Sequence, residues 1–477
     1  MFELLHQYIE LFFVTCKTEM LKAIKIFLIY FVGVSSLYPC TTILIGKGLS
    51  KDGSILHAHN EDMGQNTVGR LWRTKGNTPT DIDSIWVPYV SLTEPSQKLG
   101  YWASGNTRAI QSNELNKVTL PYDNILVGMN EAGLTMSCNW MNSKELPMEG
   151  KGIRRYAIRQ LILERCSTSY EAVLLIGSLI EQFGQADWGG LTYVLADPIE
   201  GWIVETTTHT WVAKKLKDNE IIAIANRFTI GENYDVSSAN LISHAINSGW
   251  YNPSAGPFNF KLAYGNPDYM NDIYDSEREG RVNELFNPKK GTITPLDLME
   301  VLKDRYQNTG HYCSPTDFEP WRDICQEKGI KRPICTNLCQ SSFVAHLRSN
   351  LPIELGPVFW FTFATPAYGP YFPIYPVGTK IDNRFSIDDP KDTYSNAWWN
   401  YRHIQQKVDI MDRGTMDHIQ SQSQVQTNMI LVNHFNWEKQ MLEQLKNNQL
   451  NQAISTANRF TNLSARFSLN FVKRQLK

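Results

Sequence analysis

Residues 40–62 decide the predicted fold, and they read CTTILIGKGLSKDGSILHAHNED. Two runs of β-forming residues, 41–46 and 54–59, flank Asp52-Gly53, which is the strongest local turn signal. The pattern predicts a β-hairpin, with Cys40 at the start of the first strand and His59 to Asp62 at the end of the second. Because these two ends are adjacent in antiparallel strands, residues that can carry chemistry should meet by local pairing alone.

The remainder of the chain alternates between strand-like and helix-like segments. Further strands are predicted at 124–129, 133–138, 192–196, 202–206 and 221–225, and helices at 153–164, 170–183, 294–302 and 429–445. This alternation indicates α/β or α+β layering. The Pro- and aromatic-rich stretch 352–376 is predicted to be an irregular packed segment. The composition becomes helical and Gln/Asn-rich after residues 387–392, which is the candidate domain boundary.

The first forty residues have the pattern of an export signal. Lys22 and Lys25 precede the apolar run 26–34, and the small residues Ser35 and Ser36 follow it. The run is shorter than the about 20 apolar residues that span a bilayer as a helix, so no stable membrane anchor is expected. We predict a secreted or periplasmic protein. Since Pro39 is a poor residue at a signal-peptidase site, exposure of Cys40 would need a second trimming step.

The net charge and the cysteine content limit the kinds of binding partner and metal site that the sequence predicts. The net charge of -2 gives no domain-sized basic face, so no nucleic-acid partner is predicted, and a small zwitterionic partner fits better. A homo-oligomer is left open. Once Cys16 has left with the signal and Cys40 is set aside, the remaining cysteines suit disulfides or buried thiols: Cys138, Cys166, Cys313, Cys325, Cys335 and Cys339. Zinc at the last four is disfavoured because Cys335 and Cys339 form the one closely spaced pair, and neither a metal site nor a cofactor is predicted.

Cys40 is the candidate nucleophile. If processing ends just before it, one residue carries both a thiol and a free α-amine. An α-amine with an ordinary pKa of about 7.7–8.0 can take a proton from a thiol with an ordinary pKa of about 8.5. The alternatives for a cysteine after a signal are lipid modification and a disulfide.

Several motifs resemble those of a known family. Cys40-Thr41-Thr42-Ile43-Leu44, Asp52-Gly53-Ser54 and Ala58-His59-Asn60-Glu61-Asp62 resemble the opening of the C69 dipeptidases, which are cysteine N-terminal-nucleophile hydrolases. Secernins, penicillin V acylases and bile-salt hydrolases are more distant relatives. The resemblance continues through residues 128–134, 163–166, 196–198, 202–206, 225–227, 342–352 and 360–375. It implies an α+β fold, the four-layer αββα sandwich of N-terminal-nucleophile hydrolases, with additional C-terminal helices. The implied organisation is a removed segment 1–39, a catalytic domain 40–385 and a helical extension 386–477 packed on that domain.

The resemblance also implies roles for individual residues. Cys40 matches the nucleophile, Asp62 the carboxylate that holds the α-amine, and Asn226 an asparagine near the oxyanion. Asn139 falls near another oxyanion-type position. His59 stands where the family usually has arginine, so it either donates a hydrogen bond to thiolate or substrate or is structural.

Substrate binding is expected to involve both signs of charge. A dipeptide carries an ammonium and a carboxylate, for which Glu61 and an arginine are available. Arg278 and Arg281 both lie where relatives carry a pocket arginine. The predicted function is hydrolysis of small peptides through an acyl-enzyme. The alternatives are an N-acyl amide hydrolase of the penicillin V acylase or bile-salt hydrolase type and a non-catalytic secernin-like protein.

Overall fold

The computed structural model divides the chain into two units, Met1–Pro39 and Cys40–Lys477. It describes residues 40–63, 68–78, 92, 95–106, 124–146, 152–187, 189–270, 272–312, 331–387 and 395–477. The predicted signal lies outside these residues, as do Cys313 and Cys325.

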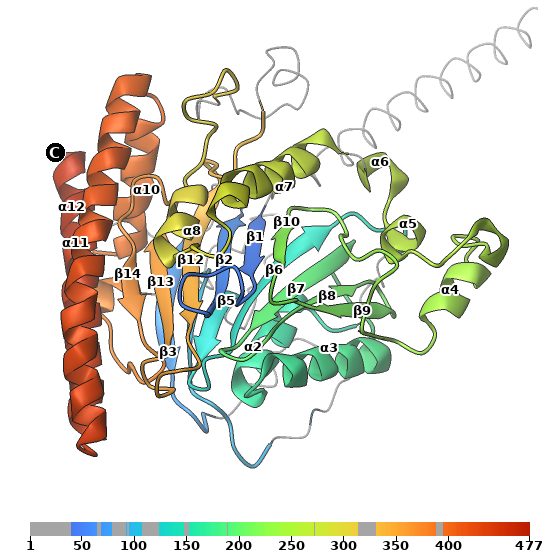
Figure 1. Cartoon of the computed structure of the whole chain (residues 1–477), viewed down its shortest axis with the longest axis horizontal. Coiled ribbons are helices and arrows are strands. Elements are labelled where there is room, and N and C mark those ends of the chain that lie inside the picture. The colour runs from blue at the N-terminus through green and yellow to red at the C-terminus, as the bar shows by residue number, and fades with distance from the viewer. Residues whose placement is uncertain are drawn as a thin grey trace, which may run out of the picture. The chain divides into compact units, whose positions relative to one another are not determined.

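A six-stranded antiparallel sheet contains the predicted hairpin (Figure 1), and Cys40 directly precedes the second strand in its order. Its order is β10 (Ile221–Ile224), β1 (Thr41–Ile45), β2 (Ile55–Asp62), β12 (Cys339–Leu347), β13 (Pro357–Phe363) and β14 (Phe372–Ile374). The predicted hairpin is confirmed, since β1 pairs antiparallel with β2. The prediction of an irregular segment at 352–376 is wrong. Residues 358–363 are β-branched and aromatic, and they pair with β12.

An eight-stranded antiparallel sheet stacks on the first. Its order is β11 (Val236–Ser237), β9 (Trp211–Lys215), β8 (Gly201–Thr206), β7 (Gly190–Ala196), β6 (Thr135–Met141), β5 (Asn124–Asn130), β4 (Tyr101–Asn106) and β3 (Gly69–Thr74). The strands predicted at 124–129, 133–138, 192–196 and 202–206 all lie in this sheet. Leu44, Val194 and Phe343 are buried together between the two sheets.

Helices cover the two outer faces (Figure 1). α2 (Arg155–Arg165) and α3 (Ser169–Phe183) bury Ile158 and Val173 against the eight-stranded sheet. α7 (Ile273–Phe286) and α8 (Pro295–Val301) bury Val282 and Leu298 against the six-stranded sheet. The shorter elements are α4 (Leu241–Asn247), α5 (Phe260–Tyr264), α6 (Pro267–Met270) and the 3-10 turns Pro253–Ala255, Asn287–Lys289 and Asn383–Phe385. Two helical layers enclosing two sheets confirm the predicted α+β, αββα fold.

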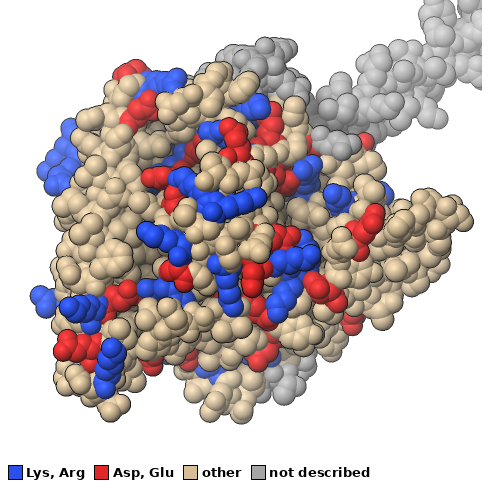
Figure 2. Space-filling view, in the orientation of Figure 1, with Lys and Arg blue, Asp and Glu red and all other residues tan. Residues whose placement is uncertain are grey.

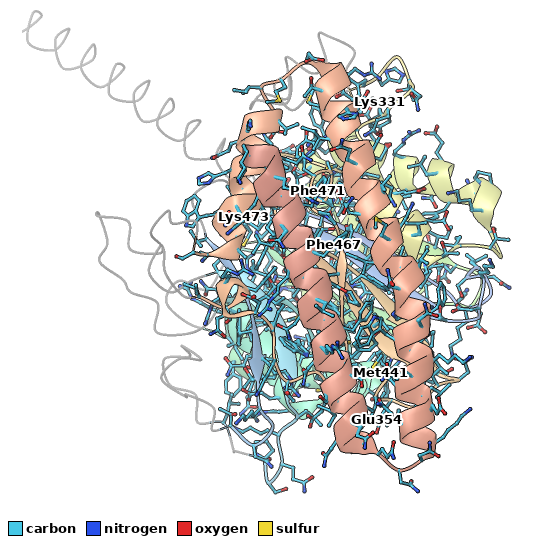
Figure 3. The ribbon with its side chains drawn as sticks, turned by 90° about the vertical axis from the view of Figure 1, so that its left-hand side faces the viewer. Lys331, Glu354, Met441, Phe467, Phe471 and Lys473 are labelled. Atoms are coloured by element: carbon cyan, nitrogen blue, oxygen red, sulfur yellow. The ribbon has the colours of Figure 1, made fainter. Side chains whose placement is uncertain are left out.

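Three helices end the chain: α10 (Ala397–Val408), α11 (Arg413–Lys446) and α12 (Leu450–Leu476). α11 and α12 form a long antiparallel pair, side by side in Figure 3, and the predicted helix 429–445 lies within α11. α12 also packs on β14, where Thr461 Oγ1 donates to the carbonyl of Pro373 at 2.9 Å. Within the described residues, no helix has both the length and the apolar character needed to span a bilayer.

Candidate active site

Cys40 lies at the open end of the β1–β2 hairpin, opposite the turn. The register pairs Thr41 with Asn60, so Cys40 falls beside the last residues of β2. Its Sγ atom is 3.8 Å from Glu61 Oε1 and 3.8 Å from the backbone oxygen of Asp62. All three residues are buried. The hairpin thus places the thiol beside the carboxylate of Glu61 and the backbone oxygen of Asp62.

A row of polar side chains runs between the two sheets towards Cys40. Because side chains alternate along a strand, His57, His59 and Glu61 share one face of β2. His57 contacts the hydroxyls of Thr135 and Ser137 at 3.0 and 2.9 Å. We call this row the polar seam; it consists of His57, His59 and Glu61 with Thr42, Thr135, Ser137 and Asn139. Its middle lies at His57 and its end at Cys40.

Hydrogen bonds fix the tautomer of His59. The amide nitrogen of Asn139 donates to the backbone oxygens of Cys40 and Ala225 at 3.2 and 2.9 Å, which leaves Asn139 Oδ1 to accept. The Thr42 hydroxyl donates to that oxygen at 2.5 Å. Thr42 Oγ1 must then accept the Nδ1–H of His59, at 2.7 Å.

The opposite ring nitrogen faces a carboxylate. His59 Nε2 lies 3.1 Å from Glu61 Oε2. In the neutral ring Nε2 carries a lone pair, so this contact joins two acceptors unless a proton or another cation lies between them. Burial lowers the pKa of His59, and the contact with Glu61 opposes that shift.

Arg278 reaches from α7 to the backbone of Cys40. Its Nη1 donates to the carbonyl oxygen of Cys40 at 2.6 Å and to Thr41 Oγ1 at 3.0 Å. Its Nη2 donates to Asn226 Oδ1 at 2.8 Å and to Asp275 Oδ1 at 2.6 Å. The arginine is fully buried. Together with Asn139 it holds the Cys40 carbonyl from two sides.

Arg281, one turn further along α7, lies in a different environment. It pairs with Asp304, with Nε 2.8 Å from Oδ1, and with Glu284. Between the two arginines that the sequence could not separate, the structure therefore places Arg278 at Cys40. Arg281 is engaged in holding α7 to the segment after α8.

Asn226 follows β10 and is oriented by two contacts. Its Nδ2 donates to the backbone oxygen of Trp140 at 2.9 Å, and its Oδ1 accepts from Arg278. Through Arg278, these contacts connect Asn226 to the residues around Cys40. One N–H of its amide is used in the hydrogen bond to Trp140. Asn139 likewise donates from its amide nitrogen to backbone carbonyls, and one of these is the carbonyl of Cys40.

The two carboxylates beside Cys40 differ in charge state. Burial raises the pKa of Asp62 to about 7, against the opposing influence of Thr336, Arg278 and Arg332. The hydrogen-bonding side chains that face the Asp62 carboxylate in the described part of the chain are those of Thr336 and Cys339, both of them neutral groups. Burial also acts on Glu61, but its contact with His59 and the charge of Arg159 outweigh it and lower the pKa of Glu61. Burial and both neighbouring carboxylates raise the pKa of the Cys40 thiol. The thiol is therefore protonated and needs a base.

Sequence reasoning missed two residues of this cluster. Thr42 stands two positions after Cys40 and so shares its strand face, a signal that strand alternation could have given. Arg159 is buried under the eight-stranded sheet, where it donates to the backbone oxygen of Ile125 at 2.9 Å. The charge of Arg159 lowers the pKa of Glu61 although the two residues belong to different layers of the fold, so no local sequence pattern could have predicted the interaction.

The described cysteines other than Cys40 are buried free thiols: Cys138, Cys166, Cys335 and Cys339. Cys335 lies 3.0 Å from the hydroxyl of Thr365. The sequence left a disulfide and a buried thiol open for these cysteines, and the structure has buried thiols at all four positions.

A cavity of about 600 Å³ is lined in part by the residues that directly follow Asn226. Its lining includes Arg227, Phe228 and Glu279, and Arg227 Nε donates to Glu279 Oε2 at 2.9 Å. Cys40 is not part of this lining. Figure 2 shows that Lys and Arg lie interspersed with Asp and Glu on one face of the molecule. The cavity likewise carries both signs of charge.

Comparison with known proteins decides the family. Residues 39–428 match the model of Peptidase family C69. The chain belongs to peptidase family C69. It is therefore a peptide hydrolase by family, as the resemblance of its motifs implied.

Relatives share the match over most of their length. The chain is 26% identical over 400 residues to a probable dipeptidase from Salmonella dublin, covering 74% of this chain and 85% of that protein. It is 23% identical over 396 residues to dipeptidase A from Lactobacillus helveticus, covering 76% and 80%. Among solved structures, penicillin V acylase from Agrobacterium tumefaciens matches with a TM-score of 0.40 at 16% identity, covering 73% of this chain and 89% of that one.

Proposed function

We propose that this protein is an exported dipeptidase in which Cys40, made N-terminal by removal of residues 1–39, is the nucleophile. The observation that carries the proposal is the environment of Asp62. Its carboxylate is buried near the thiol, and the hydrogen-bonding side chains that face it among the described residues, Thr336 and Cys339, are neutral. An ammonium on Cys40 would give this carboxylate a charged hydrogen-bond donor.

The α-amine of Cys40 would act as the base. It takes the thiol proton while Sγ forms a bond to the peptide carbonyl carbon. The carbon–nitrogen bond then breaks, and the leaving amine takes the proton from the α-ammonium. In the second half, water loses a proton to the α-amine and attacks the thioester, which releases the acid and restores the thiol. Asp62 orients the amine throughout.

The remaining residues have supporting roles. Asn226 can direct an N–H of its amide at the oxyanion, and loss of one such donor typically costs about 3 kcal/mol of transition-state stabilisation. Arg278 and Asn139 act as positioning residues, because their contacts hold the Cys40 carbonyl. Glu61 and His59 flank the thiol. The nearby charged cavity, with Arg227 and Glu279, suits a zwitterionic substrate.

The decisive experiment pairs N-terminal mass determination with turnover. The purified protein is assayed on a dipeptide panel, with penicillin V and a glycine-conjugated bile salt alongside. We expect active material to begin at Cys40, to prefer dipeptides, and to be labelled at Cys40 by a thiol-directed probe. A matched form with one extra residue fixed ahead of Cys40 should be inactive. Full turnover by that form would refute the α-amine mechanism, and preference for the two non-peptide amides would refute the dipeptidase assignment.

A further inference from the structure

Three side chains of different type converge at the end of the polar seam. Cys40 Sγ, one ring nitrogen of His59 and one carboxylate oxygen of Glu61 all lie within 4.8 Å of one another. All three residues are buried. Thiolate, imidazole and carboxylate are the protein ligands that bind Zn²⁺.

We propose that Cys40, His59 and Glu61 form a binding site for a thiophilic divalent cation such as Zn²⁺, which holds the enzyme reversibly inactive. The geometry is close to what the ion requires. Zinc–ligand bonds of about 2.0–2.3 Å in a tetrahedron put neighbouring ligand atoms about 3.3–3.6 Å apart. Glu61 Oε1 lies 3.8 Å from Cys40 Sγ and Oε2 lies 3.1 Å from His59 Nε2. A ligand set with one atom from each residue spans up to 4.8 Å, so it contracts when the ion binds.

The orientation of His59 supports the same conclusion. Metal-bound histidines usually donate their second ring N–H to a fixed acceptor, which sets the tautomer. Here Thr42 accepts from Nδ1 and is itself held by Asn139, so the Nε2 lone pair points at Glu61. A cation between Nε2 and Oε2 turns a contact between two acceptors into two coordinate bonds.

The ligand set selects the class of ion. A thiolate with an imidazole favours Zn²⁺ and similarly soft ions over Mg²⁺, which prefers oxygen ligands. On binding, the Cys40 thiol loses its proton to solvent and the sulfur–metal bond forms. Three protein ligands leave a fourth position for water. The sulfur is then unavailable for attack, and removal of the ion restores it.

The test measures binding first and activity second. Isothermal titration of the purified full chain with Zn²⁺ should give one site, and Cd²⁺ should produce thiolate-to-metal absorption in the ultraviolet. Mg²⁺ should do neither. Cys40→Ala and His59→Gln should each weaken Zn²⁺ binding by at least 100-fold. His57→Gln, which changes the neighbouring histidine on the same strand face, should bind Zn²⁺ as the native chain does.

Several outcomes would overturn the proposal. They are the absence of Zn²⁺ binding to the native chain, unchanged binding in Cys40→Ala, and equal loss in His57→Gln and His59→Gln. If His59→Gln does not fold, as judged by circular dichroism, Glu61→Gln takes its place with the same expectation. Zn²⁺ should inhibit turnover, and a chelator should restore it. This inhibition rests on the proposed role of Cys40 as nucleophile, whereas the binding of Zn²⁺ does not. Zn²⁺ binding without loss of turnover would keep the site and refute the nucleophile.

Discussion

The middle and the end of the polar seam make an instructive comparison. His57 and His59 lie two residues apart on one face of β2, and both are fully buried. His57 contacts two hydroxyls: that of Thr135 donates to the backbone oxygen of Ala196 and so accepts from one ring nitrogen, and that of Ser137 can donate to the other. His59 contacts one hydroxyl whose proton is already committed and one carboxylate.

The difference lies in the balance of donors and acceptors. In the middle of the seam every polar group is neutral and satisfied, so the contacts stabilise the packing of the two sheets. At the end, the lone pair of His59 faces the carboxylate of Glu61, and the neutral side chains of Thr336 and Cys339 face the carboxylate of Asp62. Buried carboxylates attract protons and cations, and these two lie near the Cys40 thiol.

The largest expected effect comes from the thiol itself. Cys40→Ala should lower dipeptide turnover by roughly 10³-fold or more, because no other group replaces the nucleophile. Stability should change little, since alanine fits the buried site. Cys166→Ala, another buried thiol, is the matched control and should keep turnover within about twofold. Equal losses in both variants would mean that the end of the seam is not the site of reaction.

The two arginines of α7 sharpen the comparison next. Arg278→Met should lower kcat on the order of 100-fold, because the Cys40 carbonyl and Asn226 both lose a donor. Arg281→Met should mainly lower the free energy of unfolding, by about 3 kcal/mol, since it leaves buried Asp304 unpaired. Steady-state kinetics and urea unfolding on the same samples separate the two. A kcat loss that follows stability in both variants would contradict the positioning role of Arg278.

Sequence reasoning succeeded where the chain itself brings residues together. Cys40, Glu61 and Asp62 lie at adjoining ends of one hairpin, so strand pairing predicts their meeting. The choice between Arg278 and Arg281 could not be made from sequence, because residues three apart on a helix point to similar sides. The partners Asp275 and Asp304 decide it, and only packing reveals them.

The wrong prediction at 352–376 has a specific cause. Its prolines favour an irregular segment, yet Pro357 begins β13 and Pro373 lies in β14, which is an edge strand. Both are positions where a strand tolerates a missing N–H. Asn139 and Thr42 belong to different sheets, and their contact depends on how those sheets stack.

A smaller effect should separate the two histidines. His57→Gln should lower the free energy of unfolding by about 1–3 kcal/mol, because the buried hydroxyls of Thr135 and Ser137 lose an adaptable partner. The turnover of folded protein should stay within about threefold. His59→Gln should lower kcat about 10-fold, since it alters the group that flanks Glu61 beside the thiol. If His57→Gln lowered kcat as much as His59→Gln does, the middle of the seam would also take part in the reaction.

The smallest effect concerns Glu205, a buried carboxylate that, unlike Asp62, accepts hydrogen bonds from backbone N–H groups. Glu205 on β8 accepts from the backbone N–H of Thr229 at 2.6 Å and of Ile230 at 3.1 Å, and burial still raises its pKa to about 7. A raised pKa means that the folded chain binds the proton more tightly than the unfolded chain. The contribution to stability is therefore complete below the ordinary pKa and is lost as the pH rises through about 7.

Glu205→Gln should remove this pH dependence. Between about pH 5.5 and pH 7, the unfolding free energy of the native chain should fall relative to that of the variant by about 1.5 kcal/mol. Urea unfolding at several pH values measures the difference between slopes, so the fixed cost of the substitution cancels. Parallel curves would mean that the backbone donors keep Glu205 charged in the folded state. Backbone N–H donors would then be what distinguishes the two buried carboxylates. Glu205, which has them, stabilises the fold as a charged group, whereas Asp62, whose partners are side chains, can accept an ammonium.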